Sequence, residues 1–355
     1  IEDQTLIPDK RPSIYFYQQE FQVHNQQVVR NGMLCGLMLE PHDNSIIISY
    51  EQSLSKIKAD RLSLLRATGS NFSPILGLFA DQERYLKTTI DEQVKTRPPD
   101  VNLVDENNVI HRLWVIEDET VITHTVDFMR NKKIYIAEGH HRYESALEYF
   151  REMTEQGHDN YNYIMANLVN LYDDAMFTYP AHMLIGNLAY FNYNTFIEQL
   201  TEIFVVEMVD NQDDLPGFMQ ELARRDTNGR HVFGMYANNK LHFLELKETN
   251  KKIPSSKSAD LNIPDATILY DLVMRKILGI SEHRHQEHIA YSPTEEYITD
   301  QIRKKQFQLG FLLNPPQIEE LVEVSNSENP ITPLRLAYLY PPLLAGLVIN
   351  NLNIK

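Results

Sequence analysis

The sequence of 355 residues is short of several features that mark common protein classes. Its single cysteine, Cys35, excludes a disulfide framework and a cysteine-rich zinc site. Lysine and arginine number 33 against 49 aspartate and glutamate residues, which gives a formal net charge of −16. Nonspecific DNA binding and attachment to an anionic membrane both require a basic surface. We therefore expect neither nucleic acid nor a membrane as a partner.

Long apolar runs and several well-known motifs are also missing. The longest apolar stretches, Met33–Leu39 and Leu343–Ile349, are much shorter than a membrane span. No signal peptide opens the chain, so a cytoplasmic protein is expected. The motifs of P-loop kinases, Rossmann dehydrogenases and α/β-hydrolases are absent, which removes sequence support for these three classes of enzyme.

What the sequence does contain is one stretch, residues 134–150, that reads as strand, tight turn and helix. Ile134, Tyr135 and Ile136 form a short run typical of a buried strand, and Gly139 lets the backbone leave it sharply. A helical pattern follows at once, with apolar positions Tyr143, Ala146, Leu147, Phe150 and Met153. The polar group before it, formed by Glu138, His140, His141 and Arg142, is therefore expected at the N-terminus of the helix.

A glycine turn at a helix N-terminus can hold an anion, because backbone N–H groups and the helix dipole meet there. Arg142 could clamp two phosphate oxygens, and His140 and His141 offer further donors or a proton relay. Glu138 would repel phosphate unless it binds a metal ion or takes a proton from a substrate hydroxyl. The alternative is a charged cap on an ordinary helix. Four functional side chains within five positions favour the phosphate turn.

A second charged position lies in the predicted helix 53–68. Its apolar face is predicted to contain Leu54, Ile57, Leu64 and Leu65, and Arg61 falls in the middle of that face. A buried arginine needs an anion, which is either an internal carboxylate or a substrate group. Glu51, just before this helix, is either a general base or a helix-end charge.

Four other histidines receive structural interpretations. His111 shares a strand face with apolar residues, so a core-edge histidine is favoured over a catalytic one. His283, His285 and His288 are closely spaced, but the H-E-x-x-H zinc signature is absent. A solvated loop is the favoured interpretation of these three residues, with adventitious metal binding as the alternative.

The stretch Glu138-Gly-His-His-Arg-Tyr-Glu-Ser-Ala-Leu147 resembles the D-G-H-H-R-Y-E-T-A-L signature of family 1015 of the domains of unknown function. Residues 51–79, 111–116, 161–164 and 336–349 also resemble segments of that family, so nearly all of the chain is covered. The family is grouped with ParB and sulfiredoxin-like proteins, which include free-serine kinases. Its members begin with additional residues carrying a P-P-Y-D motif, so the resemblance implies that part of the site precedes Ile1.

The resemblance implies a nucleotide site at the turn. Gly139, His140, His141 and Arg142 would hold the phosphates of ATP or ADP, and Glu138 would bind Mg²⁺. The catalytic residues would be Glu51, Glu138 and His141. A small-molecule substrate would contact Arg61, Asn71, Ser73 and His182.

Patterning along the chain suggests an α+β protein with three parts. Residues 1–190 are expected to form a mixed-sheet, ParB/sulfiredoxin-like core that carries the phosphate turn. Residues 191–250 are expected to form a small α/β lobe, with a hairpin at Asn238-Asn239. Residues 251–355 are expected to be mainly helical and to pack on the core, after a linker at 251–260.

The favoured function is phosphate transfer to or from a small hydroxylated metabolite, with serine or phosphoserine preferred by resemblance alone. The sequence also departs from the family. Met183 stands where the family has arginine, and Pro333–Tyr338 replaces a lysine-bearing segment. A nucleotide-sensing or interaction protein that has lost turnover is therefore the alternative. The oligomeric state is open, with a homodimer as one option.

Overall fold

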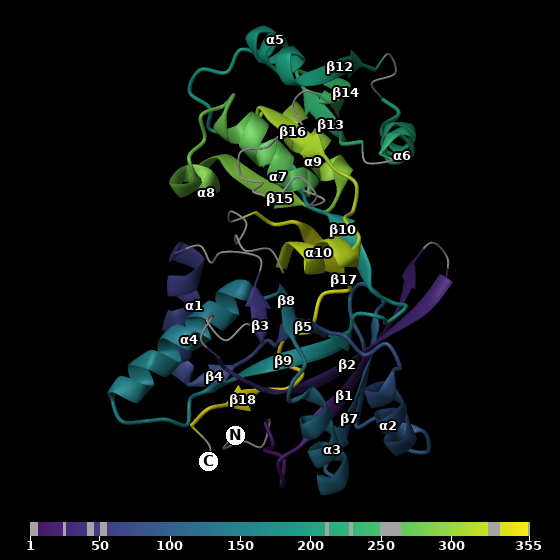
Figure 1. Cartoon of the computed structure of the whole chain (residues 1–355), viewed down its shortest axis with the longest axis vertical. Coiled ribbons are helices and arrows are strands. Elements are labelled where there is room, and N and C mark those ends of the chain that lie inside the picture. Colours follow the sequence, from purple (N-terminus) through teal and green to yellow (C-terminus); the bar gives the residue numbers. More distant parts are fainter. Residues whose placement is uncertain are drawn as a thin grey trace. The chain divides into compact units, whose positions relative to one another are not determined.

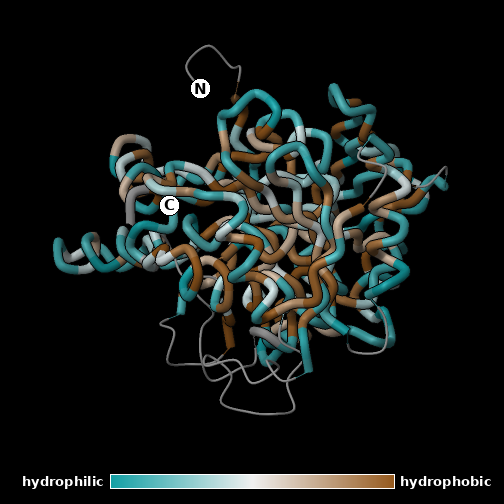
Figure 2. Tube along the Cα trace, turned by 90° about the horizontal axis from the view of Figure 1, so that it is seen from above, coloured by the Kyte–Doolittle hydropathy of each residue, from teal (hydrophilic) through white to brown (hydrophobic). Residues whose placement is uncertain are grey.

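A computed structural model describes residues 6–23, 26–40, 46–49, 55–209, 213–226, 230–248, 264–325 and 334–353. The chain divides into two compact units (Figure 1). The first contains Ile1–Phe177 together with Leu339–Lys355, and the second contains Thr178–Tyr338. Hydrophobic stretches alternate with hydrophilic ones along the chain trace (Figure 2). Among the described residues, no helix has the length and apolar character that a membrane span needs.

The first unit is built on a mixed eight-stranded sheet in the order β3-β8-β5-β9-β2-β1-β7-β6. Most neighbouring pairs are antiparallel, but β3 pairs with β8 and β5 pairs with β9 in parallel. The strands are β1 (Ile14–Val23), β2 (Gln26–Met38), β3 (Ile47–Ser49), β5 (Ile75–Phe79), β6 (Val101–Val104), β7 (Ile110–Ile116), β8 (Ile134–Glu138) and β9 (Tyr163–Asn170). A separate short pair joins β4 (Ser70–Asn71) to β18 (Asn350–Asn351).

One face of this sheet, called the helical face below, packs against α1 (Ser55–Thr68), α2 (Tyr85–Val94), α3 (Glu119–Met129) and α4 (His140–Glu155). Alternate strand residues such as Phe16, Ile75 and Ile136 form one core with helix residues such as Ile90 and Tyr143. Because side chains alternate along a strand, the intervening residues project from the opposite face. The sheet therefore carries two chemically different surfaces.

The opposite face holds the C-terminal segment that continues β17 (Ala337–Tyr340). Arg30 donates to the carbonyl oxygens of Tyr340, at 3.2 Å, and of Pro341. Nε2 of Gln19 donates to the carbonyl oxygen of Pro342 at 2.9 Å. Buried side chains of β1 and β2 thus satisfy backbone acceptors that come from more than 300 residues later in the chain.

The second unit contains a six-stranded sheet in the order β12-β14-β13-β16-β11-β15. Its strands are β11 (His182–Ile185), β12 (Phe204–Met208), β13 (Val232–Ala237), β14 (Lys240–Leu246), β15 (Ile289–Ser292) and β16 (Leu309–Leu312). Its helices include α5 (Tyr193–Ile203), α6 (Leu215–Arg225), α7 (Asp265–Leu269), α8 (His285–His288), α9 (Glu295–Arg303) and α10 (Ile318–Ser325). Strand β10 (Phe177–Pro180) pairs with β17.

Several sequence predictions are confirmed, and others need correction. The hairpin turn at Asn238-Asn239 is present, with φ values of 51° and 58°. The region after residue 251 was expected to be mainly helical, but β15 and β16 complete the second sheet. Helix α9 ends at Arg303, and the chain then enters β16 rather than continuing as a helix. The predicted linker 251–260 lies outside the described residues.

Asn31 and Gly32 lie inside β2 and pair with β1, although an Asn-Gly pair often marks a turn. Gly32 serves a different purpose. A Cβ atom there would lie 2.4 Å from Oδ1 of Asn167 on β9, so the glycine makes room for a neighbouring amide. Isolated Asn-Gly pairs often mark turns, but in this position the glycine is explained by close packing between strands.

Candidate functional site

Gly139 connects β8 to α4, as the sequence predicts, and is the N-cap residue of that 16-residue helix. Its φ of 93° lies in the region that favours glycine. The backbone N–H groups of Arg142 and Tyr143 both donate to its carbonyl oxygen, at 2.9 and 3.0 Å. The turn is therefore tight, and its conformation depends on the absence of a side chain at position 139.

Arg142 folds back over this glycine. Its Nε and Nη2 atoms each lie 3.0 Å from the position that a Cβ at residue 139 would occupy. Its Nη1 donates to the carbonyl oxygen of Pro74. Among the described residues, Nε and Nη2 have no hydrogen-bond partner, so the edge of the guanidinium that can bind two oxygens side by side is uncommitted.

The charged groups near Arg142 shift the pKa of its guanidinium in opposite directions. Burial lowers the pKa of its guanidinium, the nearby Glu138 carboxylate acts in the raising direction, and Arg61 lowers it further. Arg142, Arg61 and Glu138 therefore lie within electrostatic range of one another at the turn.

Glu138 ends β8 beside an irregularity in the pairing with β5, where Leu76 lies opposite Glu138 but Gly77 lies opposite Ile136. Because Ile75 belongs to the helical face, its neighbour Leu76 and the paired Glu138 project from the opposite face. Oε1 of Glu138 accepts a long hydrogen bond of 3.4 Å from the backbone N–H of Leu339. The half-buried carboxylate is thus loosely held.

The two histidines of the turn differ. His140 is buried, and its Nε2 lies 2.9 Å from the carbonyl oxygen of Ile136, so its imidazole is tied to the preceding strand. His141 is half-buried, and its carbonyl oxygen accepts a hydrogen bond of 2.7 Å from the Ser145 hydroxyl. Of the two side chains, that of His141 is thus the more exposed.

The prediction that Arg61 is buried in α1 is wrong. Arg61 is exposed, Ile57 and Leu64 are 38% and 41% exposed, and the buried residues of this helix include Leu62 and Leu65. The helix is rotated from the predicted orientation because α4, rather than the sheet alone, sets its buried side. The Lys58–Glu148 pair, at 3.3 Å, joins these two helices. Arg61 nevertheless lies close enough to lower the pKa of Arg142.

Asn71 and Ser73 precede β5 in the first unit. Asn71 is buried, and its Oδ1 accepts from the Met165 N–H at 3.1 Å and from Nδ2 of Asn350 at 3.0 Å. These bonds give Asn71 a structural role in joining β9 to the C-terminal segment. Ser73 is half-buried and adjoins Pro74, whose carbonyl oxygen binds Arg142.

The remaining predicted site residues are His182 and Glu51. His182 lies in β11 of the second unit, where its Nδ1 accepts from the Leu313 N–H at 3.0 Å and its Nε2 is 3.8 Å from Oε2 of Glu295. Glu51 lies outside the described residues. Among the described residues, no group of three or more metal-ligating side chains is present.

The interpretation of His283, His285 and His288 as a solvated loop needs correction, because they lie in short helices and two of the three are buried, while His283 is exposed. His285 is 2% exposed and His288 is 6% exposed. Nε2 of His285 lies 2.9 Å from the Tyr291 hydroxyl, and Nδ1 of His288 lies 3.0 Å from the carbonyl oxygen of Gly186. Burial lowers the pKa of His285 to about 4, so this imidazole is neutral at physiological pH.

Sequence reasoning missed Arg30. This side chain is 1% exposed on the opposite face, and burial lowers its pKa to about 10, while Glu138 acts in the raising direction. Arg30 therefore contributes positive potential at the Glu138 carboxylate. Strand alternation could have found it, since Arg30 interrupts a strand whose next residues are largely apolar.

Comparisons with known proteins identify a family. The family described as "Protein of unknown function (DUF1015)" matches residues 1–267, which confirms the predicted family. A conserved hypothetical protein from Pyrococcus furiosus has 12% identity and a TM-score of 0.42, covering 88% of this chain and 94% of that chain. Free serine kinase in complex with AMP has 12% identity and a TM-score of 0.40, covering 88% and 90%.

A C-terminally truncated SbnI from Staphylococcus aureus has 9% identity and a TM-score of 0.46, covering 91% of this chain and 90% of that chain. No curated protein matches. Identity and TM-scores this low transfer no residue role to this chain.

Proposed function

The chain belongs to the family described as "Protein of unknown function (DUF1015)", and we propose its function from the turn at Gly139. The protein binds the phosphates of ATP or ADP at this turn. It transfers a phosphoryl group to or from a small hydroxylated metabolite. The observation that carries this proposal is the uncommitted Nε and Nη2 edge of Arg142, directly over the glycine. A planar, bidentate donor at a helix N-terminus matches two oxygens of a phosphate.

Each residue at or near the turn has its own proposed role. Gly139 keeps the space above the turn open, and Arg142 binds phosphate oxygens. His141 relays a proton, since an imidazole can both accept and donate near neutral pH. Arg61, exposed but electrostatically close to Arg142, attracts the anionic part of the substrate.

The carboxylate of Glu138 can bind Mg²⁺ or accept a proton from a substrate hydroxyl. Magnesium in phosphoryl-transfer sites is commonly held by one or two carboxylates together with phosphate oxygens and water, so a full protein cage is not required. Within the described part of the chain, the carboxylate of Glu138 accepts one long hydrogen bond, from the Leu339 N–H, which a stronger ligand can displace. When bound, Mg²⁺ would neutralise part of the negative charge of the phosphates. Glu51 is the other proposed general base.

Serine or phosphoserine is the proposed substrate, by family resemblance. The free serine kinase chains hold AMP or ADP, but their TM-scores are too low to assign that ligand here. The competing proposal is a nucleotide-sensing protein without turnover. Met183, at the position of a family arginine, motivates it, because this side chain is buried and apolar in β11.

Calorimetry with ATP and ADP in the presence of Mg²⁺ tests the phosphate turn. Arg142→Lys should weaken binding about tenfold or more, because lysine keeps the charge but loses the bidentate fork, and Arg142→Ala should weaken it further. Arg151→Ala is the matched control, since Arg151 lies on the same helix and is 64% exposed in its side chain. Unchanged affinity in both Arg142 variants would show that the turn is only a helix cap.

Turnover separates enzyme from sensor. His141→Asn should preserve nucleotide binding and reduce phosphate transfer to serine, because asparagine can donate a hydrogen bond but cannot titrate near neutral pH. A labelled-phosphate assay against serine and other hydroxylated metabolites measures this. Nucleotide binding by the wild-type protein without transfer to any acceptor would support the sensing protein instead.

A further inference from the structure

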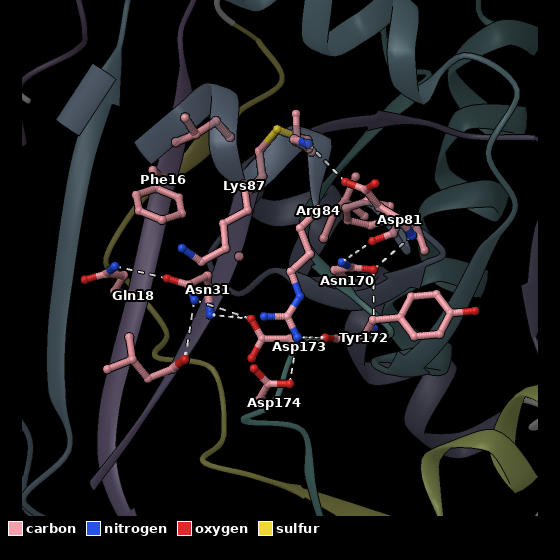
Figure 3. Close-up of a pocket in the computed structure, with 17 residues that line it drawn as sticks. Phe16, Gln18, Asn31, Asp81, Arg84, Lys87, Asn170, Tyr172, Asp173 and Asp174 are labelled. Atoms are coloured by element: carbon pink, nitrogen blue, oxygen red, sulfur yellow. Dashed lines mark hydrogen bonds and ion pairs between the residues drawn. The ribbon is translucent and has the colours of Figure 1, made fainter. Parts of the chain in front are cut away.

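A cavity of ≈ 390 Å³ opens on the helical face of the first unit, between α2 and strands β1, β2 and β9 (Figure 3). The parallel strands β5 and β9 both end beside it, at Phe79 and Asn170. Because β8 runs antiparallel to β5, Gly139 at the end of β8 lies at the other end of the sheet. The cavity is therefore separate from the proposed phosphate turn.

Two cationic side chains from the start of α2, Arg84 and Lys87, extend into this cavity (Figure 3). Nη2 of Arg84 donates to the carbonyl oxygen of Tyr172 at 3.0 Å and to Oδ1 of Asp174 at 2.7 Å. Lys87 donates to Asp91 through one contact. Nε and Nη1 of Arg84 and two of the three ammonium protons of Lys87 have no partner among the described residues.

The ion pairs that these cations make are weakly held. The side chain of Asp174 is 84% exposed and that of Asp91 is 41% exposed. Exposed pairs of this kind contribute little to stability because water screens them. A ligand anion inside the cavity could therefore add to or replace these partners.

The three carboxylates of the lining already have partners. Half-buried Asp173 accepts from the Asn31 N–H at 3.3 Å, from Nδ2 of Asn31 at 3.4 Å and from the Ala175 N–H at 2.9 Å. Buried Asp81 accepts from the Leu86 N–H at 3.0 Å, and exposed Asp174 is paired with Arg84. The remaining donors of Arg84 and Lys87 can therefore bind an anionic head group.

The lining also contains an apolar part. It includes side chains from both the sheet and α2, namely Phe16, Met33, Phe79, Leu86, Ile90 and Leu168, while Gln18, Asn170 and Tyr172 add further polar groups. A combination of apolar surface and polar groups is the usual arrangement of a small-molecule site. A ligand that fits both regions has an apolar body and one anionic group.

The backbone of Arg84 provides an independent observation. Arg84 has φ 54° and ψ 33°, a left-handed conformation that is costly for a side chain with a Cβ. Glycine would adopt it without strain. Backbone strain at a residue whose side chain points into a cavity is typical of functional sites. The strain lowers stability, so a role in binding would explain why it is present.

We propose that this cavity binds a small organic carboxylate with an apolar body. Arg84 and Lys87 hold the carboxylate, and the body packs between Phe16 and Ile90. Binding here does not depend on the nucleotide turn, because the two sites lie at different ends of the sheet.

Calorimetry on the full chain with hexanoate and benzoate, and with hexylamine and benzylamine as cationic counterparts, tests the proposal. At least one carboxylate should bind with a Kd below about 1 mM, and the amines should not. Lys87→Gln and Arg84→Gly should each weaken carboxylate binding about tenfold, since each removes a charge-assisted donor. Arg84→Gly should leave the melting temperature unchanged or raise it, because it relieves backbone strain.

Two matched controls separate the site from general effects. Asn108→Gly relieves a similar left-handed conformation, with φ 60°, away from the cavity. Lys304→Gln removes a lysine that pairs with an aspartate four residues earlier, in the second unit. Both controls should bind carboxylates as the wild type does. Failure of both carboxylates to bind, equal binding of the amines, or unchanged binding in Lys87→Gln and Arg84→Gly would overturn the proposal.

Discussion

The hydroxyl of Tyr17 lies 2.6 Å from Nδ1 of His111, and both side chains are 1% exposed. Nε2 of His111 lies 3.3 Å from Oδ2 of the half-buried Asp105, so the three residues form one hydrogen-bonded chain that joins β1, β7 and the turn before β7. With Asp105 ionised, His111 donates to it through Nε2 and accepts a hydrogen bond from the Tyr17 hydroxyl at Nδ1. His111 is therefore a satisfied core histidine, as the sequence suggests, and its partners explain how it tolerates burial.

Tyr17→Phe should lower the free energy of unfolding by ~1–2 kcal/mol, because it leaves Nδ1 of His111 buried without a donor. Tyr15→Phe is the matched control. The Tyr15 hydroxyl binds Asp9 at 2.6 Å at an exposed position, where water can replace the lost bond. Urea unfolding of both variants measures the difference. Equal losses would contradict a special cost of leaving His111 unsatisfied.

Asp105→Asn should have a pH-dependent effect on stability. Burial acts to raise the pKa of Asp105, but hydrogen bonds from the Val109 N–H, from His111 and from the Asn107 N–H outweigh it, and the pKa is lowered. A lowered pKa in the folded state stabilises the fold above the unfolded pKa, which is near 3.8, and this contribution disappears as the pH falls through the folded pKa. The deficit of Asp105→Asn should thus be largest above about pH 5 and shrink below about pH 4. A deficit that stays constant from pH 3 to 7 would show that the carboxylate charge is irrelevant.

Gly32→Ala should destabilise the first unit more than Gly36→Ala, although both glycines lie in β2. An added Cβ at residue 32 would meet the Asn167 amide at 2.4 Å, whereas at residue 36 it would make an ordinary contact of 3.6 Å with Tyr163. Asn167 is 1% exposed, so its amide cannot move aside into solvent. We expect a loss of ~1–3 kcal/mol for Gly32→Ala and little change for Gly36→Ala, measured by thermal and urea unfolding. Equal effects would mean that Asn167 can move aside within the fold.

The parts of the structure that sequence predicted best depend on local interactions. The strand, turn and helix around Gly139 follow from the periodicity and conformational freedom of neighbouring residues. Arg61 was misplaced because its orientation depends on packing between α1 and α4, which periodicity within one helix does not contain. Arg30 escaped notice because its acceptors, at Tyr340 and Pro341, lie more than 300 residues away. His288 was misjudged for the same reason, since its partner is the carbonyl oxygen of Gly186.

Gly139→Ala tests the turn on which the proposed function depends, and Gly157→Ala is its matched control. Both glycines have positive φ, 93° and 86°, so alanine introduces comparable backbone strain of ~1–2 kcal/mol at each. The surroundings differ. A Cβ at residue 139 would meet the Ile75 side chain at 2.9 Å and the Arg142 guanidinium at 3.0 Å, whereas nothing lies within 4 Å at residue 157.

If Gly139→Ala reduces stability and nucleotide affinity more than Gly157→Ala does, the difference comes from the space between residue 139 and the Arg142 guanidinium. Gly157→Ala should lose ~1–2 kcal/mol of stability and bind ATP or ADP normally. Gly139→Ala should lose more stability and weaken nucleotide binding at least tenfold, because the methyl group displaces the guanidinium edge and fills the place of a phosphate oxygen. Thermal unfolding and calorimetry on both variants give the comparison. Wild-type nucleotide affinity in folded Gly139→Ala would place the phosphates elsewhere in the protein.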